Sequence, residues 1–288
     1  MRKTSLLFCV ALAGCHIGPE GGPDRTLASR IPADTMLLAG VRMDALRGTV
    51  LYQKVLEGRG LSEFDKLAGR ASFDPRKDVK EMLFAFDGRS GVLLAKGRFG
   101  KPSIQDAEQA GHRGATLWGV QNWWVAFPDG ETAVAGTREM VGRVLDGPGG
   151  GGKGLLERAR KLPRAAQAWM VFDGGAFQAN AAPDASNLSN FTRVFRSMTE
   201  ASFYIEADKG LDGLLEGRCQ NEKQARTLSD AVRGLVGIAR LSVPSSHSEA
   251  LRFYDGITVG QHDDELSIRI RVPEDALDAF LKFAVPPR

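Results

Sequence analysis

Apolar and polar positions alternate along the first third of the chain in a way that predicts strands and helices in turn. The apolar run 35–41 predicts a buried strand, and helical spacing then places Leu51, Tyr52, Val55 and Leu56 on one face, followed by Leu61, Phe64 and Leu67 on a second short helix. The runs 82–86 and 92–99 flank Asp87-Gly88-Arg89-Ser90-Gly91, whose turn-forming residues predict a hairpin.

The next segment predicts a helix, a strand meander and a second helix. Pro102 is expected to start a helix that carries Ile104 and Ala107, because proline suits a first helical turn. Short apolar runs separated by turn residues predict strands at 115–120, 123–127 and 132–135. Thr137 is the expected N-cap of a helix with Val141, Val144 and Leu145 on its apolar face.

The second half repeats this order. A strand is predicted at 167–172, a helix at 191–198, a hairpin of 202–207 and 211–219, strands at 251–261 and 266–272, and a closing helix over 277–284. The clearest amphipathic helix carries Leu228, Val232 and Leu235 on the face expected to be buried.

The two halves therefore predict an α+β protein with an internal duplication. Each half has the order β-α-β-β-α-β, which is ferredoxin-like, followed by one more strand and helix. We expect two related halves, each an antiparallel sheet with helices on one face. The segment Lys96-Gly97-Arg98-Phe99 aligns with Glu216-Gly217-Arg218-Cys219 at the end of the hairpin in each half.

Glycine composition sets the expected domain boundaries. Six glycines between Gly147 and Gly154 predict a linker, so 31–146 is the first domain, 147–166 a glycine-rich linker with a short helix, and 167–288 the second domain. The same run matches the start of a phosphate-binding loop, G-x-x-x-x-G-K. Gly154 stands where that loop needs Ser or Thr, and a helix precedes the run where the loop needs a strand, so the linker interpretation is preferred.

The N-terminus has the order of a secretory signal. Arg2 and Lys3 form a basic start, residues 6–13 are apolar, and small residues precede Cys15. Residues 1–14 are the expected signal peptide, and 15–30 are an expected tether, because His16 to Asp24 are rich in glycine and proline. The alternatives are an ordinary signal peptide and a buried start of the first domain.

The ending Leu12-Ala13-Gly14-Cys15 resembles the lipobox of bacterial lipoproteins. The resemblance implies that the chain is cut before Cys15 and that this cysteine is lipidated. It also implies an extracytoplasmic, periplasm-facing protein of the bacterial cell envelope, with the membrane as partner through Cys15. The remainder resembles duplicated envelope lipoproteins of unknown function.

Composition narrows the function classes further. The 38 basic and 35 acidic residues are mixed along the chain, whereas a nucleic-acid-binding protein would concentrate its basic charge. Cys9 leaves with the signal and Cys15 would be acylated, so Cys219 remains alone and no disulfide can form within the mature chain. We expect Cys219 to be a small buried hydrophobe.

Motifs that carry chemistry are missing from the sequence. The histidines beyond the tether, His112, His247 and His262, lack metal-ligand spacing, and the cluster His262 to Glu265 is best explained as a solvated hairpin tip rather than a metal site. No catalytic, cofactor-binding or metal residue is assigned. Trp123 and Trp124 are a candidate aromatic surface, but consecutive strand residues face opposite sides, so one of them should be in the core.

Two classes of function follow from these observations. The first is a lipid-anchored, non-enzymatic module that binds an envelope protein or small ligand, or organises the envelope, without a cofactor. The alternative is an extracytoplasmic hydrolase whose site is assembled only in three dimensions. A deep pocket with converging titratable groups would favour the hydrolase, whereas a shallow apolar groove or a flat sheet would favour binding.

The lipobox generates the first testable prediction. Cys15→Ser should release or mislocalise the protein while residues 30–288 still fold, because the lipid lies outside the globular part. Fractionation of the native host with mass spectrometry of the N-terminal peptide measures this. An intact, unmodified N-terminus at Met1 in the wild-type protein would contradict the assignment.

Overall fold

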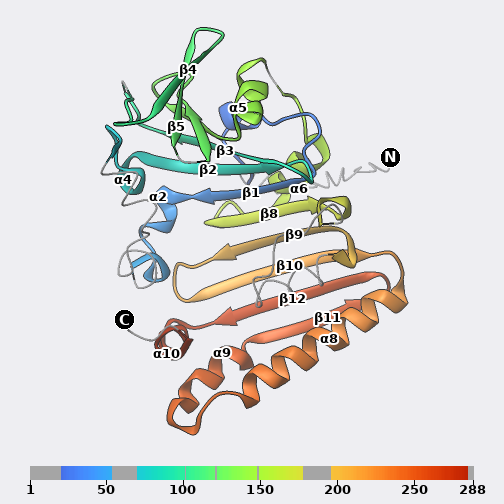
Figure 1. The fold of residues 1–288 in the computed structure, drawn as a ribbon. Helices are drawn as coiled ribbons and strands as arrows, with labels where there is room; N and C mark the ends of the chain where they lie inside the picture. The colour runs from blue at the N-terminus through green and yellow to red at the C-terminus, as the bar shows by residue number, and fades with distance from the viewer. Residues whose placement is uncertain are drawn as a thin grey trace, which may run out of the picture.

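The computed structural model describes residues 21–53, 70–100, 102–120, 122–147, 149–177 and 196–284, in which all strands belong to one antiparallel sheet (Figure 1). The α+β class is confirmed. In sheet order, the twelve strands of the described residues are β11 (Ile257–His262), β12 (Glu265–Val272), β10 (Leu211–Cys219), β9 (Met198–Glu206), β8 (Ala168–Asp173), β1 (Leu37–Arg42), β2 (Val79–Phe86), β3 (Gly91–Gly97), β7 (Thr132–Gly136), β6 (Trp123–Ala126), β5 (Ala115–Val120) and β4 (Glu108–His112).

Helices connect and cover these strands. The predicted cap is confirmed at the start of α5, where the Thr137 hydroxyl accepts a hydrogen bond from the Met140 backbone N–H at 3.3 Å. In the described part of the chain, no helix combines the length and apolar character needed to span a bilayer. The α-helices are α1 (Arg25–Ala28), α2 (Met43–Leu46), α4 (Pro75–Asp78), α5 (Arg138–Leu145), α6 (Lys153–Lys161), α8 (Glu222–Leu241), α9 (Leu251–Asp255) and α10 (Glu274–Ala284), and the 3-10 segments are η2 (Gly174–Phe177) and η3 (Ser245–Ala250).

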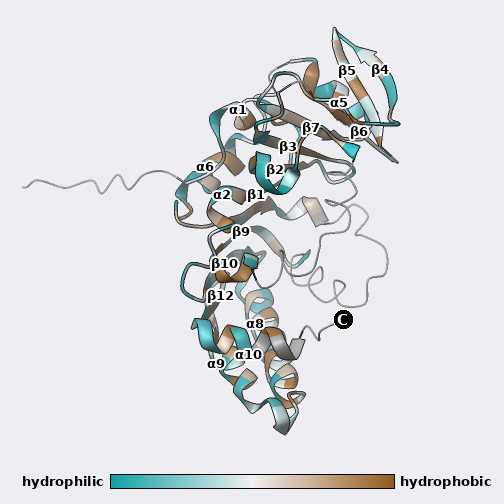
Figure 2. Cartoon of the chain, turned by 90° about the vertical axis from the view of Figure 1, so that its left-hand side faces the viewer, coloured by the Kyte–Doolittle hydropathy of each residue, from teal (hydrophilic) through white to brown (hydrophobic). Residues whose placement is uncertain are grey.

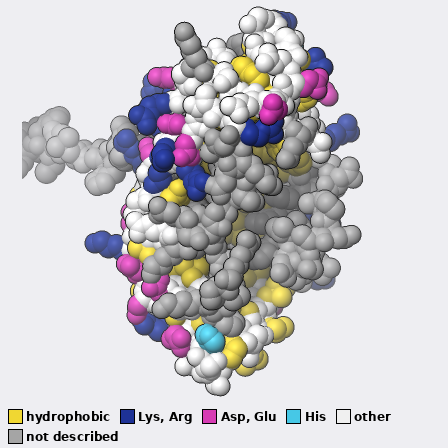
Figure 3. All heavy atoms as spheres, turned by 60° about the vertical axis from the view of Figure 1, so that its left-hand side comes forward, with side chains coloured by type: hydrophobic (Ala, Val, Ile, Leu, Met, Phe, Trp, Pro, Cys, Tyr) yellow, Lys and Arg dark blue, Asp and Glu magenta, His cyan; other side chains and the backbone are white. Residues whose placement is uncertain are grey.

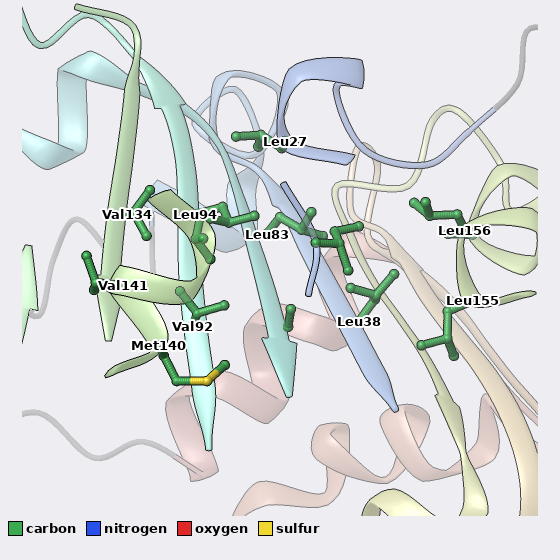
Figure 4. Close-up of a cluster of buried hydrophobic side chains, with 14 of the residues drawn as sticks. Leu27, Leu38, Leu83, Val92, Leu94, Val134, Met140, Val141, Leu155 and Leu156 are labelled. Atoms are coloured by element: carbon green, nitrogen blue, oxygen red, sulfur yellow. The ribbon is translucent and has the colours of Figure 1, made fainter. Parts of the chain in front are cut away.

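The two faces of the sheet carry separate cores. On the first, which we call the α6 face, Leu38 and Leu83 pack with α1, α5 and α6 (Figure 4). On the opposite face, which we call the α8 face, Phe172 and Leu215 pack with Ala225 and Leu228 of α8. Helices α6 and α8 thus lie on opposite sides of the sheet (Figure 2). Central strands such as β1 and β3 are apolar at consecutive positions because both of their sides are covered.

The expected pair of separate sheets is wrong, because the halves join through strands β1 and β8. These strands pair antiparallel from Leu37 opposite Phe172 to Val41 opposite Ala168. Each is a central strand, so leaving it unpaired would expose a long apolar edge. The ferredoxin-like arrangement is also not observed, since it needs parallel neighbours and every ladder between the described strands is antiparallel.

Strand order supports the predicted duplication, but helix placement does not. Outward from the central ladder, one half reads β1-β2-β3-β7-β6 and the other β8-β9-β10-β12-β11, so both predicted hairpins occupy equivalent places. However, α5 follows β7 on the α6 face, whereas α10 follows β12 and packs beside Ile270 on the α8 face. Common ancestry of the halves stays a prediction.

Several predicted elements differ from the observed ones. Residues 102–107 are not a helix: Ile104 is buried and pairs with Ala71 in an isolated bridge, while Asp106 has a φ of 55°, which ends any helix. The strand expected over 251–261 begins only at Ile257, because residues 251–255 form α9. The signal, Cys15, residues 54–67 of the helices predicted between Leu51 and Leu67, and residues 191–195 of the helix predicted over 191–198 lie outside the described residues. Met198, expected in that last helix, instead begins strand β9.

The glycine segment is packed rather than free. The N–H of Gly149 donates to the Ser29 carbonyl at 3.1 Å, and that of Gly151 donates to the Ile31 carbonyl at 3.2 Å. A Cβ on Gly149 would lie 1.7 Å from the Ile31 oxygen. Gly149 and Gly151 therefore permit close backbone approach, and the expectation of an unpacked linker between two domains is wrong for these two glycines.

The expected tether is also docked over its second part. The Gly21 N–H donates to the Arg160 carbonyl of α6 at 3.0 Å, and the Asp24 N–H donates to Glu81 Oε1 at 3.0 Å. Leu27 of α1 and Ile31 are fully buried in the core of the α6 face. Residues 21–30 are therefore part of the globular structure, because their apolar side chains fill a gap between α6 and the sheet.

Glycine packing can be tested with a matched pair of substitutions. Gly149→Ala should lower the free energy of unfolding by about 2 kcal/mol or more, because its methyl group would overlap a backbone carbonyl. Gly154→Ala should be neutral or stabilising by about 0.5 kcal/mol, since nothing lies within 4 Å of its Cβ and alanine favours the helix. Urea unfolding measures both, and equal effects would show that Gly149 is not packed.

The docked segment also predicts a pH dependence. Burial raises the pKa of Glu81 above its ordinary value of 4.5, so the folded state holds this proton more tightly than the unfolded chain. Wild-type stability should therefore fall relative to Glu81→Gln as the pH rises from 4 to 7. Urea unfolding of both proteins across this range measures the difference, and a constant difference would contradict the assignment.

Candidate functional site

A charged hollow of about 520 Å³ lies on the α6 face of the second half, and one side chain of α6 lines it. Period-two alternation builds it: Glu200, Arg218 and Glu265 point to this face, whereas their neighbours Ala201 and Leu266 point into the core of the α8 face. We call this site the charged hollow and define it by Arg158 of α6, Glu200 of β9, Arg218 of β10, and His262 and Glu265 at the β11–β12 turn.

Ion pairs neutralise the charges of this hollow. Glu200 contacts both arginines, with Oε2 3.1 Å from Arg158 Nη1 and Oε1 3.7 Å from Arg218 Nε. Arg158 also donates to Asp173, and Arg218 Nη2 lies 2.9 Å from Glu265 Oε1. The charged groups therefore pair with one another on an open sheet surface. Such an arrangement can stabilise the fold or make polar contacts with another molecule.

His262 stands at the rim of the hollow. Its Nδ1 lies 3.2 Å from Asp263 Oδ2, and its side chain is 89% exposed, as expected for a solvated hairpin tip. Among the described residues, no three His, Cys, Asp or Glu side chains are grouped closely enough to hold a metal ion. His112, in contrast, bonds Asp146 at 2.7 Å, far along the sheet from His262.

The tryptophan pair divides as strand alternation predicts. Trp123 is 49% exposed, whereas Trp124 packs against the core of the α6 face, with the Arg138 guanidinium 5.0 Å from its ring centre. The two rings therefore do not form one aromatic surface. A functional role for Trp123 stays a prediction.

Cys219 is buried in the core of the α8 face, as predicted. Burial raises the pKa of its thiol, and the nearby Asp264 carboxylate adds to the effect. The thiolate, which is the nucleophilic form, is thus disfavoured at neutral pH.

The C-terminal end of α8 exposes an apolar surface. Leu235, Ile238 and Leu241, which we call the apolar end of α8, are 46%, 64% and 87% exposed. The expectation that Leu235 is buried is wrong, because only the first part of α8 packs on the sheet through Ala225, Leu228 and Val232. Figure 2 shows brown hydrophobic positions at this lower end, and Figure 3 shows yellow side chains gathered there.

Charges beside the apolar end are paired. Arg233 contacts Asp230 at 3.0 Å, and Arg240 contacts Asp255 of α9 at 2.9 Å. The surface is consequently apolar with a nearly neutral rim. Sequence periodicity could not reveal it, since the same pattern continues along the helix after the sheet beneath it ends.

Comparison with known proteins gives a likeness of fold. No protein-family model and no curated protein matches the chain. Crystal form I of TP0453 matches 88% of this chain and 94% of its own, with a TM-score of 0.52 and 12% identity. Crystal form III of TP0453 matches 90% of this chain and 98% of its own, with a TM-score of 0.53 and 11% identity. The chain therefore has a fold similar to that of TP0453.

Proposed function

We propose that this chain is a lipid-anchored, extracytoplasmic protein of the bacterial envelope that acts as a non-enzymatic binding module. Its lipid is carried by Cys15, as the lipobox resemblance implies, and it faces the periplasm. Its binding surface is the apolar end of α8, which docks into an apolar groove of another envelope protein. The exposure of Leu235, Ile238 and Leu241 is the observation that carries this proposal.

The exposure of apolar side chains at the end of α8 indicates contact with another molecule. These three residues are grouped at one helix end, and among the described residues the only other large hydrophobic side chain exposed to this degree is Trp123. Scattered exposed apolar residues are ordinary, but a grouped set marks an interaction site. Residues spaced by three along a helix form a ridge that fits a groove on a second protein.

Charge and position favour a protein over the membrane. Helices that lie on a membrane surface carry lysine and arginine that are free to meet anionic lipids, whereas Arg233 and Arg240 are paired with acids. In addition, α8 lies on the opposite face of the sheet from Gly21, where the chain arrives from the anchor. The apolar end is thus directed away from the anchored side.

The hydrolase alternative has one specific observation in its favour. Ser246 Oγ lies 3.0 Å from His247 Nδ1, the contact that a serine nucleophile and its base require. The two residues are chain neighbours in η3, outside the charged hollow. Loss of a hydrolytic activity in Ser246→Ala would favour this function over the binding module.

Site-specific photocrosslinking in the native host tests the binding module. A photoreactive residue at Ile238 or Leu241 should give an adduct with one other envelope protein. The same group at Lys223 should not, although Lys223 is exposed on the same side of α8 about 22 Å away. Substitution at Ile238 or Leu241 should leave folding unchanged because both side chains are exposed.

Other adducts would replace this function. An adduct with twice the mass of this chain would identify a second copy as the occupant, and adducts with lipid alone would identify the membrane. Equal crosslinking from Lys223 would show that the apolar end has no special role.

A further inference from the structure

A second hollow, of about 1050 Å³, lies on the α6 face beside the docked residues 21–25. Four arginines line it, from four different segments: Arg25 in α1, Arg42 at the end of β1, Arg160 in the last turn of α6, and Arg164 between α6 and β8. We call this site the arginine hollow. Figure 3 shows arginine and lysine side chains, in dark blue, gathered on this flank of the molecule.

Close backbone packing fixes the wall of this hollow. The Gly21 N–H bonds the Arg160 carbonyl, and a Cβ on Gly21 would lie 2.2 Å from the Leu162 oxygen. The Asp24 carboxylate caps α1 by accepting the Thr26 N–H at 2.8 Å. Gly21, the first described residue after Cys15, is therefore held at a fixed point beside the arginines.

The four arginines differ in whether other groups of the protein already bind their guanidinium groups. Arg42 donates from Nε to the Ala166 carbonyl at 3.0 Å, so it is held by the backbone. Arg25, Arg160 and Arg164 are exposed, and none of the carboxylates in the described ranges forms an ion pair with them. The acids in the lining are Asp24, whose carboxylate caps α1, and Glu81, whose Oε1 accepts a hydrogen bond from the Asp24 backbone N–H at 3.0 Å.

Three open guanidinium groups around one hollow suit an anionic oxygen ligand. Guanidinium presents several N–H donors in a plane and binds phosphate with paired, charge-assisted hydrogen bonds. The ion pairs of the charged hollow, by comparison, leave no arginine there without a carboxylate. The arginine hollow is therefore the better anion site of the two.

The anchor determines which anions this hollow meets. Only five residues lie between Cys15 and Gly21, so a lipid on Cys15 holds Gly21 within about 20 Å of the membrane surface. Phosphate groups of phospholipids are concentrated at that surface. This step rests on the proposed lipid attachment at Cys15.

We propose that the arginine hollow binds the phosphate of an anionic phospholipid headgroup in the membrane that holds the lipid anchor. Arg25, Arg160 and Arg164 are the contacting residues. The anchor alone leaves the protein free to rotate, whereas a second contact beside it fixes the α6 face toward the membrane. The apolar end of α8 is then presented to the opposite side.

Hydrogen exchange with lipid nanodiscs tests this proposal. The full chain is mixed with discs of phosphatidylcholine that contain increasing fractions of phosphatidylglycerol, and exchange is followed in peptides covering 21–30 and 160–166. Exchange should slow as the anionic lipid increases. Arg160→Gln and Arg164→Gln should each raise the half-maximal lipid fraction about tenfold, the effect of one lost charge-assisted contact.

Lys161→Gln is the matched control. Lys161 is exposed next to Arg160 but does not line the hollow, so its loss should change the half-maximal fraction by less than about twofold if contact rather than net charge decides binding. All of these side chains are exposed, and unchanged exchange in the central strands verifies that each variant is folded.

Three outcomes would overturn the proposal. The first is equal slowing with phosphatidylcholine alone, and the second is equal effects of Lys161→Gln and Arg160→Gln. The third is the same slowing by inorganic phosphate with phosphatidylcholine discs, which would identify a free phosphate site. Anchoring is measured separately, from the mass of the N-terminal peptide. The nanodiscs are mixed with the chain directly, so headgroup binding can be measured whether or not Cys15 carries a lipid. An unmodified Cys15 would therefore refute lipidation, and the headgroup titration would still test the arginine hollow.

Discussion

Pairing between β1 and β8 is the constraint on which the rest of the structure depends. Each strand is apolar on both sides and starts one half of the sheet, so pairing them hides two edges at once. The continuous sheet then has two distinct faces that run through both halves. Core residues of the two faces, such as Leu38 and Leu37, alternate along the same strand. The helices on both faces therefore pack against the same strands.

This two-faced sheet separates the proposed contacts of the protein. On the α6 face, the docked residues 21–30 bring basic side chains next to the chain that leads to Cys15. On the α8 face, the helix continues after its packed first part and exposes apolar residues with paired charges around them. The proposed phosphate site and the exposed apolar surface therefore lie on opposite sides of one continuous sheet.

Local signals in the sequence predicted local structure well. The turn residues Asp87 to Gly91 specified their hairpin, Thr137 specified a helix start, and alternation separated Trp123 from Trp124. Glycine was harder to interpret, because it marks both flexible chain and close backbone approach. Gly149 and Gly21 belong to the second kind, and only the carbonyls opposite them, which are distant in sequence, distinguish the two.

The sequence by itself determined the class of fold, the hairpins, the buried Cys219 and the signal-like start, because each depends on neighbouring residues. Tertiary structure decided that the halves share one sheet, where α8 loses contact with it, and which arginines meet. Those outcomes depend on strand pairing across more than 120 residues, as for Leu37 and Phe172. Periodicity gives the face of each element, but it carries no information about which other element covers that face or where the cover ends.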